Sequence, residues 1–453
     1  MPPPGRVLVI GAGLAGLSAA WRLARAGCRV SVLERGERPG GRLAGERVEG
    51  FPLAPAPLPL HAGDERLLAL ISELGARDEL LPTKPVTTAF ASASGSLREV
   101  ELRRLRDVAR IPGISRRQAL RLVRLPRLMA RYGGAVALGA AAEASRLDDR
   151  SLADFGRLYF GRDVLERWLA PLACSGSLGD PEQMSRVQAL QHLQSWNFSR
   201  AGVLRGALDE VFERATRELE VVTQCGVDRL EPGSDGSFRA VSDDGRSFAG
   251  DAVVVATPAP LAARLASAFL SPPERSYLLG VRYAPSVGVA AALCRPMSPR
   301  ARHVLVSASL GSPLGSALVE PGYRGGAAPT GRGLALLSAS GAFAAAHLDT
   351  PSESLEKELI AAFDALWPGA GRSVDFARVF RRRFGAPRFD VGAYRALARF
   401  RRLREHPRRD GRRLFFAGDY LVAPSPEGAV RSGERAASAL LDDSSSARST
   451  SRL

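Results

Sequence analysis

The amino terminus carries a glycine-rich turn between two segments of opposite character. Arg6 to Ile10 (RVLVI) is a short apolar run rich in β-branched residues, which predicts a buried parallel strand. The turn Gly11 to Gly16 (GAGLAG) follows at once, and apolar residues then recur at helical spacing from Leu17 to the glycine at Gly27. In such a unit the three glycines permit a tight turn, close approach of the backbone to a pyrophosphate, and close packing of helix on strand.

A second apolar run and an acidic residue complete the pattern. Arg29 to Leu33 (RVSVL) predicts the next parallel strand, and Glu34 ends it about 20 positions after the glycine turn. An acid at this place accepts hydrogen bonds from the ribose hydroxyls of a dinucleotide. A glycine triplet alone is weak evidence, but strand, helix, second strand and acid in register predict a dinucleotide-binding βαβ unit.

Later segments return to this unit. Gly202 to Leu219 has the spacing of an amphipathic helix, and short strands are expected at Leu219 to Val222 and Val227 to Leu230. The sequence SDDGRSF then predicts a hairpin, and Asp251 to Ala256 (DAVVVA) predicts another buried strand. The chain therefore leaves the nucleotide unit, comes back to it, and leaves again.

The carboxyl-terminal region has the same order of features as the amino terminus: an apolar strand, a glycine, and a helix that begins with small residues. Leu414 to Asp419 (LFFAGD) is an apolar strand that ends in glycine and aspartate, and Glu427 to Leu441 reads as a helix with small residues in its first turn. Gly418 allows close backbone approach, Asp419 can bond a ligand hydroxyl, and the helix amino terminus stabilises negative charge.

The length of 453 residues exceeds the usual size of one core, so two domains are expected. We predict a nucleotide-binding domain over 1–85, 215–265 and 410–441, a second domain over 86–214 and 266–409 with a helical cap at about 103–195, and a disordered tail over 442–453.

The net charge of +16 comes almost entirely from arginine, since lysine occurs only at Lys84 and Lys357. No aromatic-interleaved basic module accompanies the charge, so no nucleic-acid partner is expected. Arg103 to Arg131 predicts interrupted amphipathic helices rich in arginine. This segment could contact an anionic membrane surface, line the mouth of a pocket for an acidic substrate, or form a solvated arginine face.

The four cysteines are far apart, with no CxxC pair and no histidine at ligand spacing. Neither a disulfide framework nor a metal site is therefore expected, and a reducing cytoplasm fits best. No apolar run reaches the length of a membrane span. The expected location is cytoplasmic, with peripheral contact at the inner face of the membrane as the alternative.

The two chain ends together resemble a known superfamily. Arg35 and Gly40-Gly41-Arg42 follow Glu34, as in FAD-binding oxidoreductases of the glutathione-reductase-like and amine-oxidase-like groups, and EGAVRSGERAA is similar to the closing motif of flavin-containing amine oxidoreductases. The resemblance implies FAD and an α/β fold, in which a Rossmann-like FAD-binding domain is interleaved with an α+β substrate-binding domain and a helical cap. It implies FAD contacts from Gly11, Ala12, Gly13, Leu14, Ala15, Gly16, Glu34, Arg35, Gly41, Arg42, Val227, Thr257, Gly418, Asp419, Gly428, Ala429 and Val430.

One internal stretch indicates a branch of this superfamily. Residues 151–190 resemble protoporphyrinogen-oxidase-like proteins, in which a helix ending in Phe-Gly, here Phe160-Gly161, leads to a Gly-Asp-Pro loop, here Gly179-Asp180-Pro181. This branch implies a large apolar or macrocyclic substrate.

Other positions depart from the family pattern. Ala54 and Ala56 replace the aspartate and second glycine of a turn that normally runs near the flavin ring. Amine oxidases of the superfamily commonly carry an aromatic residue where this chain has Ser425, and often a lysine near the flavin, whereas Lys84 and Lys357 read as surface residues.

Three functions follow from the resemblance. The leading one is an FAD-dependent oxidoreductase that removes hydride from a large apolar or porphyrin-like small molecule, as protoporphyrinogen or coproporphyrinogen oxidases do. The alternatives are a carotenoid-desaturase-like or amine-oxidase-like enzyme of secondary metabolism, and a flavin-binding protein without catalysis. The catalytic residues and the oligomeric state are left open. The sequence assigns a catalytic role to none of the five histidines, which read as surface or satisfied residues. A pocket arginine is expected for an acidic substrate, without a single candidate.

Overall fold

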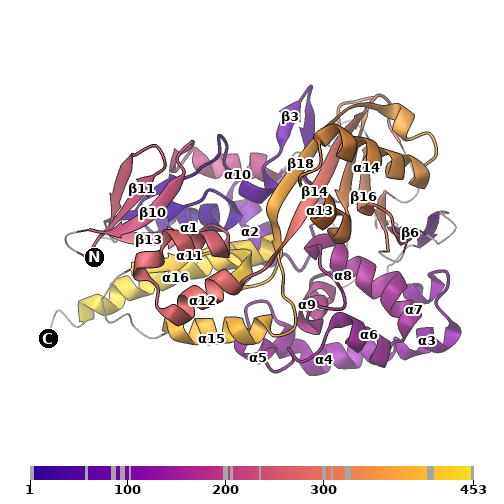
Figure 1. The fold of residues 1–453 in the computed structure, drawn as a ribbon, viewed down its shortest axis with the longest axis horizontal. Helices are drawn as coiled ribbons and strands as arrows, with labels where there is room; N and C mark the ends of the chain where they lie inside the picture. The colour runs from indigo at the N-terminus through magenta and orange to yellow at the C-terminus, as the bar shows by residue number, and fades with distance from the viewer. Residues whose placement is uncertain are drawn as a thin grey trace.

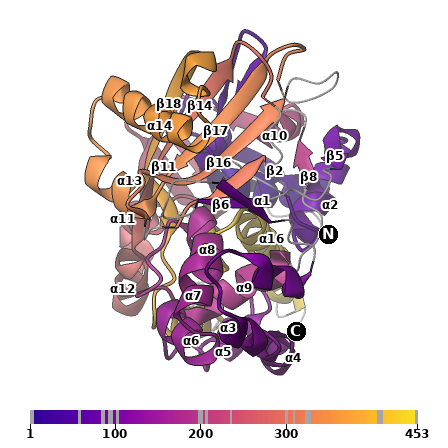
Figure 2. The ribbon, with the colours of Figure 1, turned by 90° about the vertical axis from the view of Figure 1, so that its right-hand side faces the viewer.

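The computed structural model describes residues 5–449 except 57–59, 83–87, 92–96, 101–103, 197–201, 205–207, 234–235, 298–301, 308–309, 322–327 and 406–412. Three blocks meet along the molecule: a nucleotide-binding domain that contains both termini, a large sheet backed by helices, and a cluster of helices below that sheet (Figure 1). The view turned by 90° shows the helical cluster stacked beneath the large sheet (Figure 2).

The nucleotide domain is built on a five-stranded parallel sheet of strand order β19-β13-β1-β2-β9. Its strands are β1 (Arg6–Ile10), β2 (Arg29–Leu33), β9 (Glu220–Val222), β13 (Ala252–Val255) and β19 (Arg413–Phe416). Alternate residues of β1 enter two different cores: Val7 and Val9 pack under α1 (Leu14–Arg25) and α16 (Pro426–Ser449), whereas Leu8 and Ile10 face the other side. Burial on both faces explains why these strands are continuously apolar. Segments from all three predicted stretches of this domain thus share one sheet.

A small antiparallel sheet and three helices cover that other face. The sheet contains β10 (Val227–Pro232), β11 (Phe238–Ser242) and β12 (Ser247–Gly250), which realise the hairpin expected from SDDGRSF. The helices are α11 (Ala259–Leu265), α12 (Pro272–Gly280) and α15 (Ala393–Glu405).

The second domain is organised by a seven-stranded sheet of order β18-β14-β17-β16-β15-β6-β7. Its strands are β6 (Thr88–Ala91), β7 (Leu97–Val100), β14 (Tyr283–Leu293), β15 (His303–Leu305), β16 (Leu314–Pro321), β17 (Gly333–Ala339) and β18 (Val374–Pro387). The helices α13 (Gly341–His347) and α14 (Ser352–Leu366) pack on one face through residues such as Leu355, Leu359 and Phe363. The opposite face looks towards the nucleotide domain and the helical cap.

The helical cap has its own apolar core, centred on the fully buried Trp168, Phe155 and Phe160. Its helices are α3 (Arg116–Arg121), α4 (Arg124–Val136), α5 (Ala141–Ala144), α6 (Leu152–Tyr159), α7 (Arg162–Val164), α8 (Ala170–Ser177) and α9 (Arg186–Trp196). The arginine-rich segment therefore does form interrupted helices.

The remaining described elements connect these blocks. The helices α2 (Glu65–Glu73) and α10 (Leu208–Thr216) join the core beneath α1. Two short antiparallel pairs remain: β3 (Glu46–Val48) with β4 (Phe51–Leu53), which form a hairpin, and β5 (Leu80–Pro82) with β8 (Gly202–Leu204), which are distant in sequence.

Two local predictions are wrong. The helix expected over Gly202 to Leu219 is split, because Gly202–Leu204 pairs with β5 as a strand and only Leu208–Thr216 is helical. The tail expected to be disordered from Asp442 continues α16 as far as Ser449. A polar run of aspartate and serine has little intrinsic helix preference, but here it extends a helix that tertiary packing has already nucleated.

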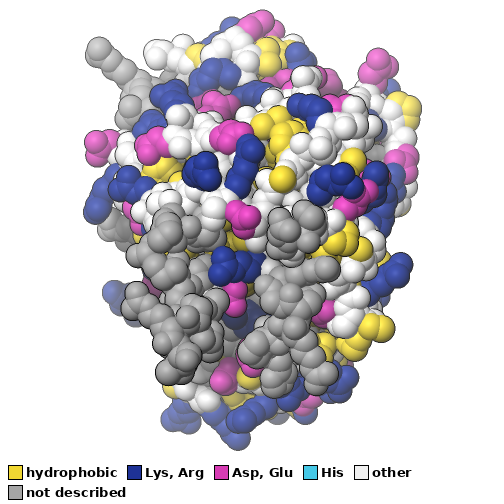
Figure 3. Space-filling view, turned by 90° about the vertical axis from the view of Figure 1, so that its left-hand side faces the viewer, with side chains coloured by type: hydrophobic (Ala, Val, Ile, Leu, Met, Phe, Trp, Pro, Cys, Tyr) yellow, Lys and Arg dark blue, Asp and Glu magenta, His cyan; other side chains and the backbone are white. Residues whose placement is uncertain are grey.

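Among the described residues, no helix is long and apolar enough to cross a membrane. On the face drawn in Figure 3, basic and acidic side chains lie side by side over most of the surface.

Candidate functional site

A cavity of about 1050 Å³ runs between the carboxyl ends of the parallel strands and the inner face of the seven-stranded sheet. The glycine turn after β1 lines one end, and side chains of β14 to β18 line the other. The helices α8 and α9 of the cap close it from below through Leu172, Gln188 and His192. This is the crevice in which parallel α/β sheets bind their ligands.

The phosphate-binding features of the motif meet at one end of the cavity. Gly11 has φ +103°, a left-handed conformation that favours glycine, and the chain then enters α1 at Leu14. No side chain caps the amino terminus of α1, and Gly13, Leu14 and Ala15 line the cavity there. Gly41, with φ +57°, lies across from Gly13. Free backbone amides and the positive end of the helix dipole thus face the cavity, an arrangement that binds anions.

Four of the predicted contact residues lie behind the cavity wall instead of in it: Ala12, Gly16, Gly428 and Val430. A Cβ atom on Gly16 would collide with the carbonyl oxygen of Gly11, and one on Gly428 would collide with that of Ala423. Backbone packing therefore requires glycine at positions 16 and 428.

Glu34 is oriented by the backbone before any ligand arrives. Its Oε2 accepts a hydrogen bond of 2.6 Å from the amide of Ala12, and its Oε1 accepts one of 2.8 Å from the amide of Gly36. Glu34, Arg35 and Val227 all line the cavity. The acid expected to bind the ribose thus lies in the same wall as two other predicted FAD contacts, Arg35 and Val227.

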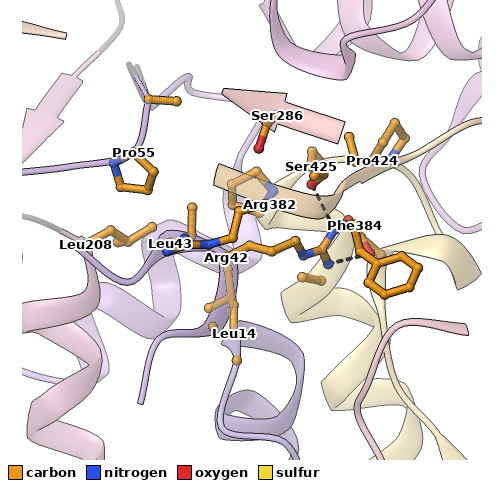
Figure 4. A pocket seen from close by; sticks show the side chains of 18 of the residues that line it. Leu14, Arg42, Leu43, Pro55, Leu208, Ser286, Arg382, Phe384, Pro424 and Ser425 are labelled. Carbon is orange, nitrogen blue, oxygen red and sulfur yellow. Dashed lines mark hydrogen bonds and ion pairs between the residues drawn. The ribbon is translucent and has the colours of Figure 1, made fainter. Parts of the chain in front are cut away.

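Arg42 and Asp419 join the two chain ends. The guanidinium of Arg42 donates two parallel hydrogen bonds to Asp419, of 2.8 Å from Nη1 and 2.7 Å from Nη2. Burial alone would lower the pKa of Arg42, but the carboxylate of Asp419 raises it above its ordinary value. Both residues line the cavity, and Figure 4 shows the side chain of Arg42 extending towards Phe384 and Ser425. Bidentate pairing fixes the guanidinium in place.

Among the described residues of the wall, the buried polar atoms without a hydrogen-bond partner include Thr257 Oγ1, His61 Nδ1 and Tyr420 Oη. Thr257 follows β13 and packs against the turn at Gly11, where the sequence expected a cofactor contact. Buried polar groups are normally satisfied, so unpaired ones at a ligand cavity indicate where a ligand atom belongs. Amides, cation and orphaned hydroxyl together fit a dinucleotide cofactor.

The turn that departs from the family pattern is part of the wall. Ala54, Pro55 and Ala56 line the cavity, and the carbonyl of Pro55 lies so close to Gly288 on β14 that a Cβ there would collide with it. The alanines thus stand between the nucleotide end and the sheet, and they provide no polar group there.

Three histidines lie in the wall, contrary to the expectation of surface or satisfied positions. His61 follows β4, His192 is on α9, and His303 is on β15. Burial lowers the pKa of His61 to about 3 and those of His192 and His303 to about 4, so all three imidazoles are neutral near pH 7. They are far apart in sequence, so no local motif could have united them. His347 lies outside the cavity on α13, and His406 is outside the described residues.

Features of amine oxidases are missing from the described part of this wall. Ser425 lines the cavity at the position where amine oxidases commonly carry an aromatic residue. Lys357 is exposed on α14, as predicted, and Lys84 lies outside the described residues.

The pocket arginine expected for an acidic substrate does not come from Arg103 to Arg131, because no described residue of that segment lines the cavity. Most of its described arginines are exposed. Arg381, Arg382 and Arg383 of β18 line the cavity instead. The pairing of β18 with β14, which is distant in sequence, brings these arginines to the cavity. The spacing of residues in the sequence does not reveal this pairing.

Comparison with known proteins agrees with this geometry. The family model of flavin-containing amine oxidoreductases matches residues 14–441. A flavin-containing monoamine oxidase of Mycobacterium tuberculosis, AofH, is 26% identical over 275 residues, which are 56% of this chain and 57% of that protein. Protoporphyrinogen oxidase 2 of Arabidopsis thaliana is 22% identical over 253 residues, 51% of this chain and 44% of that protein. The matches thus span about half the length of these relatives.

Solved structures show the same fold over nearly the whole chain. Putrescine oxidase bound to putrescine has a TM-score of 0.76 at 19% identity and covers 97% of this chain and 100% of its own. A protein from Exiguobacterium sp. 255-15, assigned as a protoporphyrinogen oxidase, has a TM-score of 0.74 at 17% identity and covers 97% of this chain and 99% of its own. The chain therefore belongs to the flavin-containing amine oxidoreductase family, and its cofactor is a flavin.

Proposed function

We propose that the cavity holds FAD with its pyrophosphate at the amino terminus of α1. The amides of Gly13, Leu14 and Ala15 and the backbone at Gly41 would bind the phosphates, and Glu34 would accept hydrogen bonds from the ribose. Val227 and Arg35 would contact the adenosine half. Three other wall residues would lie along the ribityl chain and the flavin: Thr257, Asp419, and Ala429 in the first turn of α16.

We further propose that this chain is an FAD-dependent oxidoreductase that takes hydride from a large apolar or macrocyclic molecule, similar to protoporphyrinogen or coproporphyrinogen. The bound flavin supplies the hydride acceptor. The observation that carries the proposal is the sheet end of the cavity, which is lined by neutral imidazoles and by apolar side chains of β15 to β17: Leu305, Leu318, Leu334 and Leu336. Such a wall excludes water and orients an apolar substrate without a strong acid or base.

The decisive experiment follows flavin bleaching under anaerobic conditions. We expect protoporphyrinogen or coproporphyrinogen to reduce the flavin, and polyenes or primary amines to leave it oxidised. Bleaching by amines or polyenes alone would favour the amine-oxidase-like or desaturase-like alternative. No bleaching by any of these, with flavin firmly bound, would favour a binding protein without catalysis. A visible spectrum without flavin, before and after reconstitution, would refute the cofactor assignment.

We also propose peripheral contact with an anionic membrane, through a second surface formed by α3, α4 and α6. On α3 and at the start of α4, Leu120 is 73% exposed and Val123 is 63% exposed, and Leu158 of the adjacent α6 is 59% exposed. Exposed arginines, among them Arg116, Arg117 and Arg124, flank these apolar side chains. Apolar side chains ringed by cations are typical of interfacial helices.

We expect the protein to sediment with vesicles that contain phosphatidylglycerol and not with pure phosphatidylcholine vesicles. The double variant Leu120→Ser and Val123→Ser should lose this binding. Leu279→Ser, which changes a side chain of α12 that is 51% exposed, is the matched control. Equal sedimentation of all three proteins would argue against a membrane role for this face.

A further inference from the structure

Arg382 is a cation in the cavity wall that lacks an acidic partner. It lies on β18 opposite Ser286 of β14, and Figure 4 shows its side chain beneath Ser286 and next to Pro55. Its Nη1 donates to the carbonyl of Arg381 at 3.0 Å, and its Nη2 donates to the carbonyl of Ala44 at 3.1 Å. Burial lowers the pKa of Arg382. No carboxylate of the described chain lies within ion-pairing distance of it.

The neighbouring arginines of the same strand have side-chain partners, unlike Arg382. Arg378 pairs with Glu46 at 2.9 Å, and Arg383 pairs with Asp349 at 3.1 Å. Arg381 donates to the hydroxyl of Ser352 at 2.7 Å on the surface. Arg382 is thus the described arginine of this run that is turned into the cavity with only backbone carbonyls as partners.

Two hydrogen bonds to neutral carbonyls do not fully replace the hydration that a half-buried guanidinium has lost. Removing a cation from water is costly unless an anion and hydrogen bonds replace its hydration. Of the five N–H donors of a guanidinium, the two contacts use two, which leaves a fork for a planar acceptor. The hydroxyl of Ser286 lies directly across the strand pair and can add a further hydrogen bond.

We infer that Arg382, assisted by Ser286, binds a carboxylate of the substrate and sets the preference of the cavity for acidic apolar molecules. The inference rests on the proposed function and narrows its substrate class to apolar molecules with a carboxylate side arm. A phosphate of the cofactor is the other source of an anion. The uncapped amides at the amino terminus of α1 already face the proposed phosphate site, whereas Arg382 lies beneath Ser286 on the inner sheet.

The test uses a matched pair of fluorescent ligands that share one apolar body, pyrenebutyrate and pyrenebutanol. Binding to the flavin-loaded, oxidised protein is followed by pyrene fluorescence, so no turnover is required. We expect the wild type to bind the carboxylate at least about tenfold more tightly than the alcohol. Arg382→Gln should abolish this preference by weakening only the carboxylate, and Arg382→Lys should retain part of it. Ser286→Ala should reduce it several-fold.

Arg378→Gln is the control, because it removes a cation of the same strand that does not line the cavity and that pairs with Glu46. Circular dichroism and the flavin content of each variant establish that it is folded and loaded. A preference for the carboxylate that is equal in wild type and Arg382→Gln overturns the inference, and so does failure of the wild type to prefer the carboxylate. Loss of FAD affinity in Arg382→Gln with an unchanged ligand preference would assign Arg382 to the cofactor phosphate. Absence of flavin bleaching in the presence of a retained preference would refute the proposed oxidation and leave the carboxylate site standing.

Discussion

The two ends of the cavity are built in different ways. At the nucleotide end, consecutive residues provide the site: a left-handed Gly11, the uncapped start of α1, and Glu34 held by two backbone amides. At the sheet end, the wall residues come from several elements that are distant in sequence: His192 is on α9, His303 is on β15, and His61 lies in the loop that follows β4. The first end depends on backbone geometry, and the second depends on side chains that meet only after folding.

This difference predicts unequal tolerance to substitution. Backbone amides and helix dipoles offer no side chain to exchange, so the nucleotide end is constrained mainly by whether a Cβ atom fits. The sheet end can change ligand by exchanging single side chains without altering the fold. The following substitutions test the two ends against each other.

The largest effect is expected at Gly16. A methyl group there would collide with the carbonyl of Gly11 at the point where helix and strand are packed most closely, so Gly16→Ala should lower the free energy of unfolding by about 3 kcal/mol. Gly13→Ala is its counterpart: a Cβ at Gly13 would come no closer than 4.0 Å to Gly41, but it would point to the phosphate site. Urea unfolding and flavin titration should show a folded Gly13→Ala with weakened FAD binding. An unstable Gly13→Ala and a stable Gly16→Ala would reverse the argument.

Next is the pair that joins the chain ends. Asp419→Asn leaves the Arg42 guanidinium without its carboxylate in a largely buried place, where the side chain of Asp419 is only 7% exposed. We expect a loss of about 2 kcal/mol in the apoprotein, measured by urea unfolding. Glu46→Gln breaks the more exposed pair with Arg378 and should change stability by less than about 1 kcal/mol. Equal losses would mean that burial of the Arg42 pair has no energetic role.

The histidines test the sheet end by pH. Their folded pKa values lie below that of an unfolded histidine, so the unfolded chain binds more protons and stability falls as pH drops from about 6.5 towards 4. Asp64 acts in the opposite sense, because burial raises its pKa to about 6. When the pH falls from 7 to 5, the free energy of unfolding of the apoprotein should decrease by about 1 kcal/mol less in His303→Gln than in the wild type. His347→Gln, outside the cavity, is the control. A pH dependence identical in both variants would contradict a buried, neutral His303.

The smallest effect is expected at Arg383. Its side chain is 68% exposed and pairs with an Asp349 side chain that is 82% exposed, so Arg383→Gln should change the free energy of unfolding by less than about 0.5 kcal/mol. Its preference for pyrenebutyrate should equal that of the wild type, in contrast to Arg382→Gln. A large change in either measurement would show that the arginines of β18 act as one cluster.

The predictions from sequence succeeded where local patterns carry the information. The strands at Arg6–Ile10 and Arg29–Leu33 have the predicted bounds, and the hairpin of SDDGRSF forms between β11 and β12. The helix over Gly202 to Leu219 failed, because pairing of Gly202–Leu204 with β5 overrides a helical spacing that continues only from Leu208. The last helix continues past its expected end at Leu441 as far as Ser449, because its earlier turns, packed in the core with α1, have already nucleated the helix.

By itself, the sequence determined the nucleotide end, because its function rests on the order strand, glycine turn, helix, strand and acid, and all of these are neighbours along the chain. Only the tertiary structure decided which of many arginines and which histidines enter the cavity. Strand pairing places Arg382 opposite Ser286 and turns it inward, while the arginines from Arg104 to Arg131 stay outside the wall. Burial, which sequence spacing does not record, keeps three imidazoles neutral and lowers the pKa of the Arg382 guanidinium.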